Sequence, residues 1–241
     1  INLPRNILAN KEKFKINEKN SSFVNQNSTK ANFSYIKKAI KIISNSNKTV
    51  IIAGGGIKYN SKYKNVIKLA ELLNIPMVTA AGHGDAIPFN HKLNAGQMGP
   101  RGNPVASKLV KEASVIIALG TRLGFNSTFY SYENLNKRAK IIQVELEKRM
   151  IGRYFPVAVG IYGDAATIAE QLYKEIKKQN ITLDIKKWTN NYFNERKNFL
   201  LNRDKFKQKN FPIQPNSLFK QLRQVLPKNS AITLDAGTLC L

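Results

Sequence analysis

The sequence predicts an α/β fold, in which an open parallel sheet carries helices on both faces. Short apolar runs rich in β-branched residues, typical of strands buried in a parallel sheet, alternate with segments whose apolar residues recur at helical spacing. Glycines follow directly after two of these runs, at Gly54–Gly56 and at Gly120. Alternating strands and helices indicate parallel strands joined by right-handed crossovers.

The expected elements follow one another from residue 31 to about residue 180. Strands are expected at 49–53, 77–80, 114–119, 140–145 and 157–161. Helices are expected at about 33–43, 63–73, 105–111 and 164–176. Asn60 and Ser61 are placed to cap the second helix, with Leu72 and Leu73 on its apolar face, and Asp164 is placed to cap the fourth. Residues 82–103 are expected to form a loop too long to be only a connector.

The two flanks differ from this core in composition. Residues 11–30 are rich in Lys, Asn, Ser and Gln, which is typical of a linker. Residues 181–211 are charged and contain aromatic residues, and they predict a helix that ends before Pro212 and Pro215. A helix at 218–226 and a strand at 231–234 are expected next. That strand has no helix after it, so the C-terminal end is expected to have been cut from a larger protein. The first residue is Ile rather than Met, so the same is expected of the N-terminal end.

Composition excludes several classes of protein. A hydrophobic content of 42% excludes global disorder, and a single cysteine, Cys240, with two histidines excludes a disulfide framework and a Cys/His zinc site. No apolar run is long enough to span a membrane, and no signal peptide is visible, so a cytoplasmic protein is expected. The formal net charge of +24 comes from 30 Lys and 9 Arg, and the lysines are scattered over every helix. Surface lysine explains this charge better than a nucleic-acid groove does, although a basic nucleic-acid-binding protein stays an alternative.

Three glycine-rich loops are candidates for ligand binding, because ligands of parallel sheets bind at the carboxyl ends of the strands. The loops are 54–56, 82–102 and 120–124. Glycine lets backbone N–H groups approach a phosphate. Neither Gly54–Gly56 nor Gly120–Gly124 fits Gly-x-Gly-x-x-Gly, since Tyr59 fills the sixth position of the first loop, so simple tight turns remain the alternative reading.

Few side chains suggest chemistry of their own. Glu145 at a strand end is either a ribose ligand or a solvated charge, and Arg122 either clamps an anion or pairs with a carboxylate. His83 and His91, near Asp85, have no nucleophile beside them and are expected to be structural. Cys240 is expected to be a small buried hydrophobe. The sequence contains no self-sufficient catalytic constellation.

Taken in order, a set of short motifs resembles the central domain of thiamine diphosphate-dependent enzymes of the acetolactate synthase and sulfoacetaldehyde acetyltransferase type. The motifs are 50–56 (VIIAGGG), 75–79 (IPMVT), 84–88 (GDAIP), 96–99 (GQMG), 113–123 (ASVIIALGTRL), 141–145 (IIQVE), 151–153 (IGR), 156–159 (PVAV) and 163–165 (GDA). Each is weak alone, but their order over residues 33–178 is specific. The resemblance implies a Rossmann-like central domain, flanked by the tail of an N-terminal pyrimidine-binding domain at 1–10, a linker at 11–30, a helical linker at 181–214 and the start of a diphosphate-binding domain at 215–241.

The resemblance also implies a chemistry that this stretch does not carry alone. Members of the family use thiamine diphosphate with Mg²⁺ as an electron sink for a carbanion derived from a 2-oxo acid or related aldehyde. The family's activating glutamate and metal ligands do not map onto these 241 residues. The chain alone is therefore expected to be inactive, with small molecules as the full-length protein's substrates, no nucleic-acid or membrane partner, and a homodimer or homotetramer as its assembly.

Cofactor-binding residues can be carried over by position in the motifs. Gly237 and Thr238 lie where family members begin to contact the diphosphate. Acetolactate synthases hold FAD in this domain, and the resemblance leaves FAD binding open. Two departures weaken it: Leu123-Gly124-Phe125-Asn126 follows the arginine, and Glu145-Leu146-Glu147-Lys148 follows the fourth strand. A stand-alone dinucleotide-binding module stays an alternative. The positions that match flavin contacts are Gly54, Gly55, Gly56, Gly96, Gln97, Met98, Gly99, Gly120, Arg122, Gly163 and Asp164.

Overall fold

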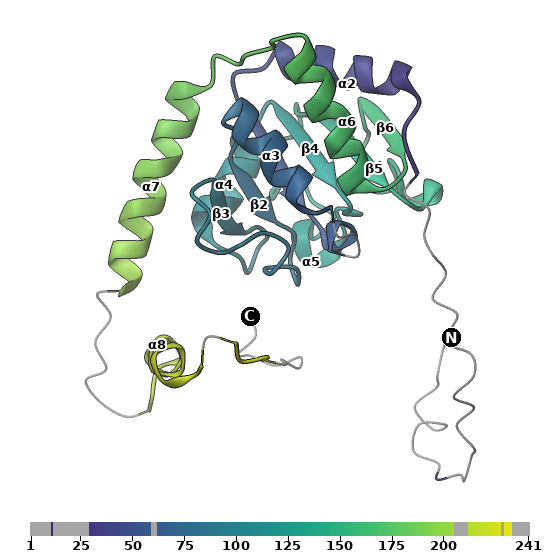
Figure 1. The fold of residues 1–241 in the computed structure, drawn as a ribbon. Coiled ribbons are helices and arrows are strands. Elements are labelled where there is room, and N and C mark those ends of the chain that lie inside the picture. The colour runs from purple at the N-terminus through teal and green to yellow at the C-terminus, as the bar shows by residue number, and fades with distance from the viewer. Residues whose placement is uncertain (1–10, 12–28, 59–61, 205–211, 228, 233–241) are drawn as a thin grey trace.

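A computed structural model describes residues 11, 29–58, 62–204, 212–227 and 229–232. It contains one sheet of six parallel strands in the order β3-β2-β1-β4-β5-β6 (Figure 1). The predicted α/β class with a parallel sheet is confirmed. The strands are β1 (Thr49–Ala53), β2 (Met77–Thr79), β3 (Asn94–Gln97), β4 (Val115–Leu119), β5 (Lys140–Glu145) and β6 (Val159–Tyr162).

Helices cover both faces of this sheet. The unit β1-α3-β2 moves along the sheet in one direction and β3-α4-β4 in the other, so right-handed crossovers place α3 and α4 on opposite faces. Helices α2 and α6 lie on the same face of the sheet as α3, and α7 runs beside α4 (Figure 1). The helices are α2 (Phe33–Ser44), α3 (Lys64–Leu73), α4 (Pro104–Glu112), α5 (Phe125–Thr128), α6 (Ala165–Lys178), α7 (Lys186–Asp204) and α8 (Pro215–Val225), with short 3₁₀ turns η2 (Gly55–Ile57) and η3 (Lys148–Met150).

Helical periodicity predicted the core faces of α2 and α6 correctly. Ile36, Ala39, Ile40 and Ile43 of α2 are buried, and the side chain of Asn32 caps this helix by accepting from the Ser34 N–H. Asp164 caps α6 as expected, and the predicted inner face of α6 is buried against the sheet. Burial of such stripes is the main source of helix stability in a domain of this kind.

Two expectations for the segment between β1 and β4 were wrong. Residues 82–103 are not all loop, because β3 pairs with β2 inside them. Its sequence, Asn-Ala-Gly-Gln, has no β-branched residue, and only two of its four residues are buried, as suits a strand at the sheet's edge. In α3, Leu73 is buried as expected, but Leu72 is 38% exposed and Leu69 is buried in its place. Asn60 and Ser61 lie outside the described residues.

The two C-terminal helices, α7 and α8, differ in how much of their surface is buried. The first half of α7 is docked, since Ile185, Trp188 and Tyr192 are all buried. Helix α8 has no buried residue. Residues 233–241, which include Gly237 and Thr238, lie outside the described residues, as do residues 1–10 and most of the predicted linker at 11–30. Within the described part of the chain, no helix is both long and apolar enough to cross a membrane.

Candidate functional site

The carboxyl edge of the sheet holds the candidate site. Strand order reverses between β1 and β4: the chain moves outward through β2 and β3 on one side, then through β5 and β6 on the other. Loops leave β1 and β4 in opposite directions at such a point, and ligands of open α/β sheets bind in the resulting crevice. Gly54–Gly56 follows β1, and Gly120 follows β4. The structure therefore brings together two of the three predicted loops at their expected place.

The two glycine loops contact each other directly through the backbone. The Gly54 N–H donates to Leu119 O and the Gly56 N–H to Gly120 O, each at 2.9 Å. A Cβ on Gly56 would lie 2.8 Å from Gly120 Cα, and Gly120 itself has a φ of +61°. Glycine is required here for close approach of two backbones and for a left-handed turn. Since the Gly54 and Gly56 amides are already hydrogen-bonded, they are not free to hold a phosphate in this conformation.

Gly55, the middle residue of the triplet, lies under the imidazole ring of His83. A Cβ on Gly55 would come within 2.6 Å of His83 Cε1. The Nδ1 atom of His83 is buried and has no hydrogen-bond partner among the described residues. Burial lowers the pKa of His83, and nearby Lys58 lowers it further, while the Asp85 carboxylate raises it. Burial and Lys58 both favour the neutral form of the His83 ring, whose buried Nδ1 has no hydrogen-bond partner among the described residues.

Beside His83, Lys58 and Asp85 form an ion pair. The Lys58 Nζ lies 2.7 Å from an Asp85 carboxylate oxygen. Hydrogen bonding from Lys58 lowers the pKa of Asp85. His91, the other predicted loop histidine, lies elsewhere: its Nε2 is 3.2 Å from Glu71 Oε1 on α3. The two histidines do not form one site, and no local pattern indicated that Lys58 would lie beside His83.

The loops after β2, β3 and β4 are tied together by side chains. Gln97 Oε1 accepts from the Gly82 N–H at 3.1 Å, and Ser127 Oγ accepts from the Ala81 N–H at 3.0 Å. Thr79, at the end of β2, has a buried hydroxyl with no partner among the described residues. With the His83 Nδ1, this gives two buried polar atoms near one strand end that lack partners.

The predicted segment 96–99 lies in this loop system but is mostly structural. Met98 is fully buried in the core. Gly96 and Gly99 have φ values of +98° and +114°, and a Cβ on Gly99 would lie 2.9 Å from Asn126 O. Backbone conformation therefore requires both glycines, whether or not a ligand binds.

Arg122 and Glu145 lie farther along the same edge. The Arg122 Nη2 lies 3.6 Å from Glu147, which also pairs with Arg149, so the structure favours the expected carboxylate-pairing alternative for Arg122. The Arg122 side chain is nevertheless 59% exposed. Glu145 ends β5 and accepts a hydrogen bond from the next residue's N–H. This carboxylate is away from the end of β2, where a dinucleotide fold holds the ribose.

Gly163 and Asp164 lie at the end of β6, two strands away from the crevice. A Cβ on Gly163 would lie 2.6 Å from Thr29 O, so this glycine lets residues 29–31 pack against the domain. Asp164 is 8% exposed and its Oδ1 accepts from the Thr167 N–H at 2.7 Å. The structure thus gives both residues local roles, and their contact with a cofactor stays a prediction.

An exposed cluster of aromatic rings near α5 was missed by the sequence analysis. Phe125, Phe129, Tyr130 and Tyr154 form a chain of neighbouring rings, with centroids 4.5 to 5.7 Å apart. Phe129 and Tyr130 have φ values of +49° and +54°, which are rare for bulky residues. The signal in the sequence was the density of aromatics at 125–132, directly after a glycine loop.

The described residues offer shape and hydrogen bonds rather than a reaction centre. No group of three or more His, Cys, Asp or Glu side chains that could hold a metal ion occurs among them. At this edge the described residues expose aromatic side chains near α5 and the Arg122 side chain, whereas the His83 Nδ1 and the Thr79 hydroxyl are buried.

Comparisons with known proteins all point to the same family. Residues 36–172 match the model of the thiamine pyrophosphate enzyme central domain. The chain is 32% identical to a probable acetolactate synthase large subunit of Methanococcus aeolicus over 84% of its own length and 35% of that protein. It is 28% identical to a sulfoacetaldehyde acetyltransferase of Castellaniella defragrans, covering 83% of this chain and 37% of the relative. The chain thus spans just over a third of the length of these relatives.

Proposed function

This chain belongs to the thiamine pyrophosphate enzymes, whose central domain it carries, and on that premise we propose that it is the middle part of a thiamine diphosphate-dependent carboligase or acyl transferase. The proposed donor is a 2-oxo acid or a related aldehyde. The supporting observation is that the family match at 36–172 covers all six strands of the parallel sheet. Relatives named for two such activities align with more than four fifths of the chain.

In this proposal the chain supports catalysis without performing it. Thiamine diphosphate, held through Mg²⁺, supplies the electron sink for the donor carbanion when it is bound. We assign the ligands of both to parts of the protein outside the described residues, with Gly237 and Thr238 near the diphosphate. The domain's own contribution is a rigid sheet whose carboxyl-edge loops are fixed by the Gly54–Leu119 and Gly56–Gly120 hydrogen bonds. We further propose a cytoplasmic protein that acts as a homodimer or homotetramer on small-molecule substrates.

The test is to assay the complete open reading frame that contains these residues, and the 241-residue chain beside it. We expect the complete protein to form acetolactate from pyruvate, or acetyl phosphate from sulfoacetaldehyde and phosphate, only with thiamine diphosphate and Mg²⁺. We expect the 241-residue chain to form neither. Turnover by the short chain, or no thiamine diphosphate dependence in the complete protein, would contradict the proposal.

A second candidate function is dinucleotide binding at the carboxyl edge, either FAD within the enzyme or as the activity of a stand-alone module. The strand order supports it, because the reversal between β1 and β4 lies where Rossmann-type sheets bind dinucleotides. Two observations weigh against it. The Gly54 and Gly56 amides make hydrogen bonds within the chain, and Arg122 pairs with Glu147. Isothermal titration of the 241-residue chain with FAD and with NAD separates the cases. Micromolar FAD binding supports the flavin reading, and no binding of either dinucleotide refutes this candidate.

A further inference from the structure

The aromatic cluster of Phe125, Phe129, Tyr130 and Tyr154 is not covered by other described residues. Phe125 is 53% exposed, Tyr130 is 50% exposed and Phe129 is 38% exposed. The rings form a chain of contacts with one another, and Arg101 and Arg153 lie over the rings at its two ends, Phe129 and Tyr154. Contiguous exposed aromatic side chains with arginines beside them are typical of a surface that contacts protein.

The fold keeps these rings at the surface at a cost in backbone strain. Phe129 and Tyr130 both have positive φ, a conformation that bulky residues rarely adopt. The fully buried Thr128 maintains it, because its hydroxyl donates to Leu123 O at 3.0 Å and accepts from the Tyr130 N–H at 3.1 Å. The Thr128 carbonyl also accepts from Asn134 Nδ2 at 3.1 Å. Strain that the surroundings maintain in this way is concentrated at functional surfaces.

The cluster lies on the β4–β6 half of the sheet, where the described chain also enters the domain. Helix α5, which carries Phe125, follows β4, and Tyr154 lies in the connection from β5 to β6. Thr29 O accepts from the Asp164 N–H after β6, and Ala31 is joined by two hydrogen bonds to Gln171 on α6. The segment that leads into the central domain therefore meets it beside the strands that carry the cluster (Figure 1).

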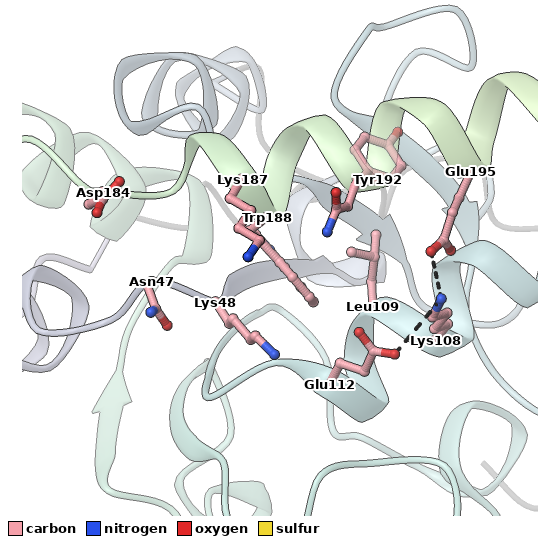
Figure 2. A pocket seen from close by; sticks show the side chains of 11 residues that line it. Asn47, Lys48, Lys108, Leu109, Glu112, Asp184, Lys187, Trp188, Tyr192 and Glu195 are labelled. Atoms are coloured by element: carbon pink, nitrogen blue, oxygen red, sulfur yellow. Dashed lines mark hydrogen bonds and ion pairs between the residues drawn. The ribbon is translucent and has the colours of Figure 1, made fainter.

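The described chain leaves the domain on the other half of the sheet. Helix α7 is joined to α4 by the ion pair of Glu195 with Lys108, next to the docked Trp188 (Figure 2). Farther along α7, Arg196 donates to Phe89 O in the β2–β3 connection at 3.3 Å, and Arg223 of α8 lies 5.7 Å from the Phe89 ring. Whatever follows α8 in a longer protein therefore starts from the β2–β3 half, away from the aromatic cluster.

We infer that the aromatic cluster is the surface on which the part of the complete protein that precedes residue 1 docks. The inference rests on the proposed function, which makes this chain the middle of a longer protein. The chain spans only 35% and 37% of the two relatives described above, so most of such a protein lies outside it.

The chemistry of the cluster defines the surface that fits it. Apolar side chains of the docked part cover Phe125 and Tyr130, and a carboxylate meets each of Arg101 and Arg153. A second copy of this chain fits less well. Arginines stand at both ends of the cluster, and each copy carries a formal net charge of +24, so two copies repel each other.

The test introduces the photo-crosslinking residue p-benzoylphenylalanine into the complete open reading frame in place of Phe125, and in place of Phe89 as the control. Phe89 is 52% exposed, so the two positions are matched in accessibility but lie on different halves of the sheet. After irradiation and digestion, mass spectrometry identifies the peptide joined to each position. We expect position 125 to be joined to a peptide encoded before residue 1, and position 89 to be joined to no such peptide.

Hydroxyl-radical footprinting of the unsubstituted proteins is a second measurement that needs no variant. We expect oxidation of Phe125 and Tyr130 to fall severalfold from the 241-residue chain to the complete protein, because docking removes both rings from water.

Several results would overturn the inference. They are a crosslink from position 125 to a peptide encoded after residue 241 or to another copy of residues 1–241, no crosslink from it, and the same preceding peptide joined to position 89. Unchanged oxidation of both rings, or a reading frame that begins at residue 1, would do so as well. None of these measurements depends on turnover, so failure of docking is distinguished from failure of the thiamine diphosphate assay.

Discussion

The two edges of the parallel sheet are held together by different kinds of contact. At the carboxyl edge, loops meet through the backbone: Gly54, Gly56 and Gly120 approach each other so closely that no side chain fits between them. At the amino edge, side chains make the connections: Trp188 joins α7 to the first residue of β1, and Thr189 joins it to the C-cap of α3, each by a hydrogen bond to a backbone carbonyl. At the carboxyl edge, the lack of space between backbones therefore restricts which residues can occupy these positions. At the amino edge, hydrogen bonding and charge restrict them.

The largest expected effect is at the carboxyl edge, from Gly54→Ala. The added Cβ would lie 2.6 Å from Thr121 Cβ and closer still to Gly120 O, and hydrogen bonds hold both residues: the Gly56 N–H donates to Gly120 O and the Gln143 Nε2 donates to Thr121 O. We expect the free energy of unfolding, measured by urea denaturation, to fall by about 3 kcal/mol or more. Gly84→Ala is the control, because the nearest atom to its Cβ is the end of the Gln97 side chain at 3.9 Å. Equal losses in the two variants would show that close backbone contact is not the cause.

At the amino edge, Trp188→Phe is expected to cost about 2 kcal/mol of unfolding free energy, because it leaves the buried Thr49 carbonyl without its donor. Tyr192→Phe, one turn along α7, is the contrast. The Tyr192 hydroxyl is buried without a partner in the described residues, and burial raises its pKa. Removing it should leave stability unchanged or raise it. A large loss in Tyr192→Phe would mean that its hydroxyl has a partner after all.

Asp164→Ala tests whether this carboxyl-edge residue serves the fold locally. Losing the cap of α6 should lower the unfolding free energy by about 1 kcal/mol, as in other helix N-caps. Asp164→Asn keeps a capping oxygen and should restore most of that loss. If the asparagine variant is as unstable as the alanine variant, the carboxylate charge matters more than the cap.

The smallest expected effect is a pH dependence from His83. Its pKa lies below the unfolded-state value, because burial and then Lys58 disfavour the charged ring. Between the folded and unfolded pKa values the unfolded chain binds more protons, so stability falls as the pH drops below about 6.5. Urea denaturation at pH 7.5 and 5.5 should show a smaller loss in His83→Gln than in the unmodified chain. An identical loss would assign the effect to other groups; Asp85, whose pKa is lowered, acts only at still lower pH.

Local patterns in the sequence predicted the elements that are buried on both sides or on one regular face. The strands β1 and β4 were found because all five residues of each are buried and mostly β-branched. The edge strand β3 was missed, since only half of it is buried and its residues carry no strand preference. Its ladder with β2 is a tertiary contact that no local pattern shows.

The candidate site was likewise predicted only in part from the sequence. Glycines after β1 and β4 marked the correct edge of the sheet, because a residue without a Cβ is needed wherever backbones meet. The sequence could not show that the two loops bond to each other, that His83 covers Gly55, or that Lys58 pairs with Asp85, 27 residues away along the chain.

By itself, the sequence determined the alternation of strands and helices and the family to which the chain belongs, because burial periodicity and motif order are properties of neighbouring residues. Only the folded domain shows the strand order, the hydrogen bonds of the Gly54 and Gly56 amides and the docking of Trp188 against the start of β1. Each of these depends on which distant segments share an edge of the sheet, and that is set by the packing of the whole domain.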